Sequence, residues 1–234
     1  MESMATAEAT PIQVTDITPG DDLKPVGHAV LVVVDIQGGD VEFPDDLGPD
    51  IDADYIKAGH AVRNPKAVEL VANFRSVGQP VVFIQEVHKP SLVDIGRELD
   101  GSEGPHALEG DPATELIPGL EPRSEEYLIQ KRRYSSFYGT QLDIVLRGYK
   151  AETVILIGGM TDVCVHYTAV DAHQFDYHIR AIPELCVGST LRAHEAALRA
   201  IKYLQRDALV TLDAVNDWLA IAPAPAPSPA AQLV

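Results

Sequence analysis

Cys164 is the residue of this chain best placed for nucleophilic chemistry. It follows an apolar run over 154–157 and a Gly158-Gly159 pair, and an apolar period then continues through Val165 and Ala169. The run predicts a buried parallel strand, and the period predicts a helix. Cys164 should therefore lie at a helix N-terminus, where free N–H groups and the helix dipole lower the pKa of a thiol.

Burial in the core is the ordinary alternative for a cysteine, because a free cysteine is among the most buried residue types. Cys186 follows Ile182-Pro183-Glu184-Leu185 without a glycine turn, and we interpret it as a core residue. For Cys164 the local context alone leaves a core role and a catalytic role equally open.

Two charged side chains could activate the Cys164 thiol. Asp35 ends an apolar run over 29–34, and Lys131 follows a short run over 127–130. The carboxyl ends of strands in an open α/β sheet line one crevice, so these residues should converge there. Asp35 could take the thiol proton and Lys131 could stabilise the anion, although Asp35 alone could simply cap its loop. The Gly158-Gly159-Met160 turn could offer N–H groups to an oxyanion.

Strands and helices that would position these residues alternate along the chain. Strands are predicted over 29–34, 80–86, 127–130, 154–157, 177–182 and 208–212. Helices are predicted from the Asn64-Pro65 pair to Gly78, from Leu142 to Gly148, from Cys164, over 191–205 with Ser189 or Thr190 as N-cap, and over 214–221. This alternation predicts an α/β fold, a doubly wound six-stranded parallel sheet with helices on both faces. The long polar segment over 89–123 is expected to cover the site.

Composition limits the class of protein. With 234 residues and 46% hydrophobic residues, we expect one domain over 26–221, an N-terminal arm over 1–25 and a disordered Pro/Ala-rich tail over 222–234. The net charge of −17 argues against nucleic acid or an anionic membrane as partner. Two cysteines and no long apolar stretch favour a cytoplasmic location. A dinucleotide-binding Rossmann domain is disfavoured because no Gly-x-Gly-x-x-Gly follows the first strand.

Three segments, taken together and in order, make the chain resemble the isochorismatase-like cysteine hydrolases over roughly residues 28 to 212. They are Val33-Val34-Asp35-Ile36-Gln37, Lys131-Arg132-Arg133-Tyr134-Ser135-Ser136-Phe137 and Gly158-Gly159-Met160-Thr161-Asp162-Val163-Cys164-Val165. That family includes nicotinamidases, N-carbamoylsarcosine amidases, biuret-type ureide hydrolases and ureidoacrylate amidohydrolases. The resemblance implies an Asp35–Lys131–Cys164 triad. It also implies a cis peptide at Gly159–Met160, with the N–H groups of Met160 and Cys164 forming an oxyanion hole.

A metal site is a second implication of the resemblance. Nicotinamidases bind a metal through an Asp-x-His pair and a later His, and the matching positions here are Glu86, His88 and His106. Glu and His are acceptable ligands for zinc or another divalent ion. Relatives that use no metal also carry Glu-x-His, so no cofactor is required. The three side chains could instead contact the substrate or hold the long loop in place.

The substrate pocket is less well defined by the sequence. Candidate wall residues are Gln37, Tyr134, Phe137 and Tyr167, although aromatic residues at such spacings more often pack in a core. Relatives often carry an acid and then Phe where this chain has Gly38-Gly39-Asp40-Val41. Three arginines could bind a substrate carboxylate or pair with the abundant acids, namely Arg97, Arg132 and Arg133.

The resemblance implies a hydrolase that cleaves a C–N bond of a small amide or ureide through a thioester and releases ammonia or an amine. Nicotinamide, N-carbamoyl amino acids, biuret-like ureides and maleamate all remain open as substrates. A metal-assisted nicotinamidase, a vinyl-ether-cleaving isochorismatase and a non-catalytic binding protein on the same fold are the alternatives. Relatives with isochorismatase activity typically lack the cysteine. Relatives are often homodimers or homotetramers, and we expect the same here.

Overall fold

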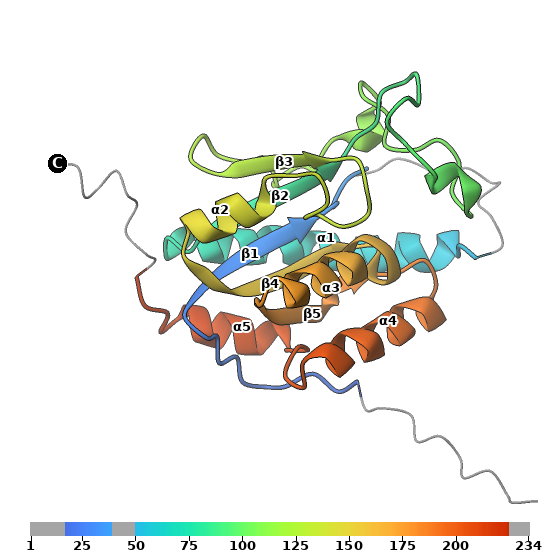
Figure 1. Ribbon diagram of the computed structural model, residues 1–234. Helices are drawn as coiled ribbons and strands as arrows, with labels where there is room; N and C mark the ends of the chain where they lie inside the picture. The colour runs from blue at the N-terminus through green and yellow to red at the C-terminus, as the bar shows by residue number, and fades with distance from the viewer. Residues whose placement is uncertain (1–16, 39–49, 225–234) are drawn as a thin grey trace, which may run out of the picture.

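A computed structural model describes residues 17–38 and 50–224, and a parallel sheet lies at its centre (Figure 1). Among the described residues the sheet has five strands in the order β3-β2-β1-β4-β5. The strands are β1 (His28–Val34), β2 (Val81–Glu86), β3 (Tyr127–Lys131), β4 (Ala151–Gly159) and β5 (His178–Val187). β1 is central because its run of buried apolar residues pairs on both sides.

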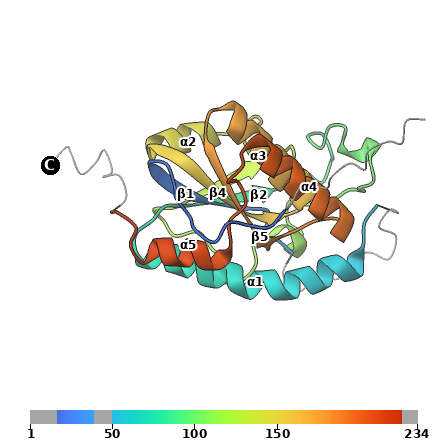
Figure 2. The same cartoon turned by 90° about the horizontal axis from the view of Figure 1, so that it is seen from below.

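Helices cover both faces of the sheet (Figure 2). One face packs against α1 (Ala53–Ser76) and α5 (Leu212–Leu219), and the other against α2 (Leu142–Gly148), α3 (His166–Gln174) and α4 (Leu191–Leu204). Successive residues of a strand point to opposite faces, so Val33 joins the core with Phe74 and Trp218, while Val34 joins the core with Leu146 and Leu198. The predicted α/β fold with a parallel sheet and helices on both faces is confirmed.

The predicted sixth strand over 208–212 is wrong. This segment makes only isolated bridges, Ala181 with Leu209 and Gly20 with Val210. Thr211 already accepts a hydrogen bond from the N–H of Ala214 as the N-cap of α5. The chain therefore turns into a helix before a strand ladder can extend, and α5 also begins earlier than the predicted residue 214.

The first helix begins at Ala53, eleven residues before the predicted Asn64-Pro65 start. Asp52 is its N-cap and accepts a hydrogen bond from the N–H of Tyr55. Pro65 lies inside the helix, where a proline costs about 3 kcal/mol. Burial of Ile56 and other residues along the helix outweighs this cost, and a local propensity signal cannot report such packing.

Part of the predicted N-terminal arm packs on the domain. The backbone of Gly20 is hydrogen-bonded to Leu209 and Thr211, and Leu23 is buried. The arm over 1–16, the tail over 225–234 and the Gly39-Asp40-Val41 part of the pocket segment lie outside the described residues. None of the helices in the described ranges is long and apolar enough to cross a membrane.

Candidate active site

Cys164 lies at the carboxyl end of β4, in a single π-helical turn (Thr161–Val165) that continues into α3. The N–H of Val165 donates to the carbonyl of Met160 at 3.1 Å, five residues back. Such turns are rare in proteins, and those that occur are often found at functional sites. The peptide bond between Gly159 and Met160 is cis, the geometry that the resemblance implied at this bond. That Met160 and Cys164 donate to an oxyanion stays a prediction.

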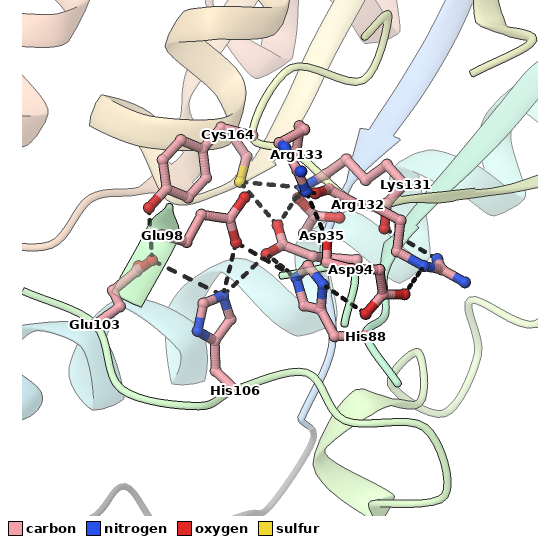
Figure 3. Close-up of polar contacts among 12 residues, drawn as sticks. Asp35, His88, Asp94, Glu98, Glu103, His106, Lys131, Arg132, Arg133 and Cys164 are labelled. Carbon is pink, nitrogen blue, oxygen red and sulfur yellow. Dashed lines mark hydrogen bonds and ion pairs between the residues drawn. The ribbon is translucent and has the colours of Figure 1, made fainter. Parts of the chain in front are cut away.

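Lys131 ends β3, and its side chain contacts side chains from the carboxyl ends of β1, β2 and β4 (Figure 3). Its Nζ lies 3.3 Å from Cys164 Sγ and 2.9 Å from Asp35 Oδ2. It also contacts Glu86 Oε2, because Glu86 and Lys131 are register partners on neighbouring strands. The structure thus brings together Asp35, Lys131 and Cys164, and it adds Glu86 to them.

Asp35 is held in an unusual backbone conformation directly after β1. Its φ of +48° lies in the left-handed region, which a residue other than glycine enters at a cost. Neither carboxylate oxygen satisfies hydrogen-bond geometry with any described residue, although both are buried and one faces the Lys131 ammonium. The Asp35 carboxylate is therefore held mainly by its charge interaction with Lys131.

Glu86 links the thiol to two histidines. Its Oε2 accepts a hydrogen bond from Cys164 Sγ at 3.4 Å, beside the Lys131 contact. Its Oε1 lies 2.9 Å from His106 Nε2 and 3.2 Å from His88 Nε2. From the sequence we considered Glu86 only as a metal ligand or pocket residue. Its alignment with Lys131 at the ends of adjacent strands is the signal that could have revealed the second role.

The pKa directions differ from the sequence-based expectation for the thiol. Burial raises the pKa of Cys164 well above its usual value; Lys131 opposes this rise, and Asp35 and Glu86 add to it. This direction is opposite to the lowering that we expected from the helix end, because burial is the largest cause acting on the thiol. A raised pKa favours the protonated thiol over the thiolate.

The two carboxylates have pKa values shifted in opposite directions. Burial raises the pKa of Asp35, with Lys131 lowering it and Glu86 raising it again. Burial alone would raise the pKa of Glu86, but Lys131 and the two histidines hold that pKa well below its usual value. Environments that push the pKa values of two acids apart in this way are typical of sites in which the acids have different roles. That Asp35 acts as the base stays a prediction.

Four side chains form a candidate metal centre beside the thiol, namely Glu86, His88, Glu98 and His106. Glu98 Oε2 lies 3.4 Å from His88 Nε2 and 3.7 Å from His106 Nε2. Together with the Glu86 contacts, these separations are close to the roughly 3.3 Å between ligands of a tetrahedral ion bound at 2.0–2.1 Å. His106 Nδ1 lies 2.7 Å from the carbonyl oxygen of Gly104, which orients the ring as a metal-binding histidine requires.

The donor set therefore fits zinc or a similar divalent ion. Both carboxylate oxygens of Glu98 are buried without a hydrogen-bond partner among the described residues, so this acid has capacity for a ligand. Sequence reasoning missed Glu98, because an acid in the long polar segment gives no periodic signal. Only the folding of that segment over β2 brings it to His88.

A cavity of about 840 Å³ adjoins this cluster. Tyr134 and Tyr167, two of the predicted wall residues, line it together with Glu98. Phe137 instead lies in the core against Phe175 and Tyr177. The side-chain amide of Gln37 links β2 to the long segment through hydrogen bonds with the backbone of Glu86 and Thr114.

The three candidate arginines have different surroundings. Arg97 and Arg133 line the cavity, while Arg132 pairs with Asp94 at 2.8 Å. Arg133 donates to the carbonyl of Asp94, and Arg97 pairs with Asp100 on the surface. Arg132 and Arg97 are thus each paired with an acid of the chain, and Arg97 and Arg133 are the two that line the cavity.

Comparisons with known proteins agree with this architecture. A ureidoacrylate amidohydrolase from Acinetobacter baylyi is 31% identical over 116 residues, which is 49% of this chain and 47% of that protein. The structure of N-carbamoylsarcosine amidase from Thermoplasma acidophilum aligns with a TM-score of 0.60 at 26% identity, over 79% of this chain and 95% of that one. A nicotinamidase from Bacillus subtilis aligns with a TM-score of 0.60 at 25% identity, over 79% and 99%.

The sequence pattern of the isochorismatase domain matches residues 29–214, which include the five strands of the described sheet, apart from the first residue of β1, and the cluster around Cys164. The matched part is most of the chain. By fold and by sequence, this protein belongs to the isochorismatase family.

Proposed function

We propose that this protein is a cysteine-dependent amidohydrolase that cleaves a C–N bond of a small amide or ureide through a thioester. The observation that carries the proposal is the position of Lys131 Nζ, 3.3 Å from Cys164 Sγ and 2.9 Å from Asp35 Oδ2. One cation thereby joins a nucleophile to a base, which is what a protonated thiol needs in order to attack. The relatives compared above are named as amidohydrolases and amidases, which supports the same chemistry.

Acylation begins when Asp35 takes the proton of the Cys164 thiol and Sγ bonds to the carbonyl carbon. The Lys131 ammonium balances the negative charge that would otherwise build up between the two groups. The carbonyl oxygen becomes an oxyanion, which the N–H groups of Met160 and Cys164 would stabilise. Protonated Asp35 then gives its proton to the leaving nitrogen, the C–N bond breaks, and ammonia or an amine departs.

Deacylation uses the same groups in reverse roles. Asp35 takes a proton from water, the hydroxide bonds to the thioester carbon, and the C–S bond breaks. The sulfur recovers a proton from Asp35, and the acid product leaves. Glu86 stays anionic throughout, because its low pKa makes it a poor proton carrier and a lasting partner for Lys131.

A metal-assisted amidase of the nicotinamidase type is the second candidate. It is favoured by four side chains whose ligand atoms lie within 4.8 Å of one another, namely Glu86, His88, Glu98 and His106. These four side chains would hold the ion, and a bound ion would supply Lewis acidity beside the thiol. Glu86 Oε2 contacts Lys131, and Glu86 Oε1 lies 2.9 Å from His106 Nε2, so Glu86 would belong both to the metal centre and to the group around the thiol. The other residues keep the roles given above.

Ammonia release from a panel of nicotinamide, maleamate, biuret and an N-carbamoyl amino acid tests the main proposal. At least one compound should be hydrolysed by the wild type and none by the Cys164→Ala variant. If no compound releases ammonia, or if the variant retains turnover, the proposed mechanism is wrong. Hydrolysis of a vinyl ether that survives Cys164→Ala would instead support an isochorismatase.

Elemental analysis of the purified protein tests the metal-assisted candidate. Bound zinc or another divalent ion should be present at about one equivalent and should be lost in His106→Ala, with His173→Ala on α3 as a control that retains it. A metal-free wild type with full activity in chelator would exclude the metal-assisted candidate and leave the ureide or carbamoyl hydrolase.

The wider setting of the enzyme stays as predicted from the sequence. The proposed domain runs over 26–221, the partner is a small amide or ureide, and neither nucleic acid nor a membrane is expected to bind. A cytoplasmic location and a homodimer or homotetramer are predictions that fractionation and light scattering can check.

A further inference from the structure

The contact between Lys131 and Cys164 crosses two intervening strands. β3, which Lys131 ends, is an edge strand of the described sheet, and β2 and β1 lie between it and β4. Neighbouring strands are about 4.8 Å apart, so β3 and β4 lie roughly 14 Å from each other. No ladder joins the two strands directly, and contacts outside the sheet must therefore help to fix the 3.3 Å between Lys131 Nζ and Cys164 Sγ.

A pair of buried hydroxyls makes such a contact. Ser136 lies in the loop that follows Lys131, and Thr168 lies on α3 one turn after Cys164. The N–H of Ser136 donates to Thr168 Oγ1 at 2.9 Å, and Thr168 Oγ1 donates to Ser136 Oγ at 2.9 Å. Both residues are completely buried. The pair therefore joins the segment that carries the lysine to the helix that carries the cysteine.

The hydroxyl proton of Thr168 is given to this loop. A threonine within a helix often donates instead to a carbonyl of the preceding turn of its own helix. A hydroxyl has only one proton, and that of Thr168 goes to Ser136. Because hydrogen bonds are directional, the pair sets where the loop lies on α3, whereas apolar contact alone would allow the loop to slide.

Other hydrogen bonds hold the same loop, but the Ser136–Thr168 link is the one most protected from water. The carbonyl of Ser136 accepts from Thr140 Oγ1, and Ser135 Oγ donates to Asp171 Oδ2, each at 2.5 Å. Asp171 follows Thr168 by three residues on α3 and lies on the same side of the helix. At a completely buried pair, water cannot replace a lost hydrogen bond, so loss of this link should disturb the loop most.

We propose that Ser136 and Thr168 are positioning residues that hold Lys131 beside the Cys164 thiol, so that the ammonium can balance the thiolate when the proton leaves. This inference rests on the proposed function and deepens it, because it assigns two further residues to the activation of the same thiol. The hydrogen bonds described above bring neither hydroxyl to the sulfur or to the ammonium. Both hydroxyls therefore act through the position of Lys131.

The rate of iodoacetamide alkylation of Cys164 near neutral pH tests the inference without a substrate. Thr168→Val keeps the shape of the side chain and removes its hydroxyl, and it should slow alkylation about 10-fold because a displaced Lys131 balances the thiolate less well. Thr168→Ser restores the hydroxyl and should return the rate to within about 2-fold of wild type.

Thr153→Val on β4 is the matched control. Thr153 is also completely buried, and its hydroxyl also makes two hydrogen bonds, accepting from the N–H of Val26 at 2.9 Å and donating to the carbonyl of Val26 at 2.8 Å. It lies near the start of β4, at the opposite end of the strand from Cys164. Urea denaturation should show a similar loss of stability in Thr153→Val and Thr168→Val, while only the latter slows alkylation.

A double-mutant cycle separates positioning of the lysine from a general loosening of the site. In Lys131→Met the counter-charge is already absent, so adding Thr168→Val should slow alkylation no further. Ser136→Ala removes one hydrogen bond of the pair and keeps the one from the backbone N–H, so it should slow alkylation less, about 3-fold. This milder variant decides the question if Thr168→Val does not fold.

Three results would overturn the inference. They are alkylation at the wild-type rate in Thr168→Val (or in Ser136→Ala where only that variant folds), an equal slowing in Thr153→Val, and a further 10-fold slowing by Thr168→Val in the Lys131→Met background. A protein that hydrolyses no amide but shows the expected alkylation pattern would refute the proposed function and support the positioning role. Amide hydrolysis with unchanged alkylation in Thr168→Val would do the reverse.

Discussion

Cys164 and Cys186 are two buried cysteines near the ends of adjacent strands in the same sheet. Cys186 lies on β5, where it is the register partner of Gly158 on β4. Cys164 is 7% exposed and Cys186 is 5% exposed. Burial raises the pKa of both thiols, that of Cys186 to about 12. Burial therefore does not distinguish them, and the difference must come from their neighbours.

Each cysteine has a buried cation nearby, but only Cys164 also has an acid suited to take its proton. A backbone hydrogen bond with Gly158 and the charge of Arg63 act to lower the pKa of Cys186, but burial outweighs them. Two nitrogens of Arg63 donate to Asn64 Oδ1 at 3.0 and 2.8 Å. Cys164 instead contacts Lys131, which also holds Asp35. A cation alone leaves a buried thiol inert, whereas a cation with a carboxylate allows proton transfer.

Removal of each thiol should produce the largest contrast. Cys164→Ala is expected to lower kcat on any hydrolysed amide by at least about 10³-fold, because no other group can form the thioester. Cys186→Ala should keep most activity and cost about 1 kcal/mol of unfolding free energy as a core substitution. Steady-state kinetics and urea denaturation measure the two effects. Equal losses of activity in the two variants would contradict the distinction.

Replacing the cation beside each cysteine sharpens the comparison. Lys131→Met should slow iodoacetamide alkylation of Cys164 near neutral pH by about 10²-fold, since the thiolate loses its counter-charge. Arg63→Met removes the other buried cation and should leave that rate within about 2-fold of wild type. Mass spectrometry of the labelled peptides gives both rates separately. Unchanged alkylation in Lys131→Met would show that the lysine does not activate the thiol.

The pH dependence should report the base that Cys186 lacks. Because burial raises the pKa of Asp35 above the ordinary 3.8, this base is protonated and inactive up to a higher pH than an exposed aspartate. The acidic limb of kcat/KM should therefore lie above pH 3.8, and activity should fall as the pH decreases through it. Asp35→Asn should lower kcat/KM by about 10²–10⁴-fold and abolish this limb. A limb that persists in the variant belongs to another group.

Much of this organisation follows from local patterns. Apolar runs over 29–34 and 154–157 predicted buried parallel strands, and both lie in the centre of the sheet. Because the carboxyl ends of parallel strands share one edge, sequence alone could also place Asp35, Lys131 and Cys164 close together. The extra strand over 208–212 had a local counter-signal, because Thr211 within it is the N-cap of α5. That its remaining residues make only isolated bridges, to Ala181 and Gly20, depends on the tertiary structure.

The amino-acid sequence by itself determined which groups end the strands, because strand periodicity and glycine turns are local properties of the chain. Only the tertiary structure decided which of those groups touch. It placed Glu86 against both Lys131 and His106, and it brought Glu98 to His88 from a segment without periodic structure. It also buried the Cys164 thiol, and burial acts to raise its pKa where the helix end alone predicted a lowering.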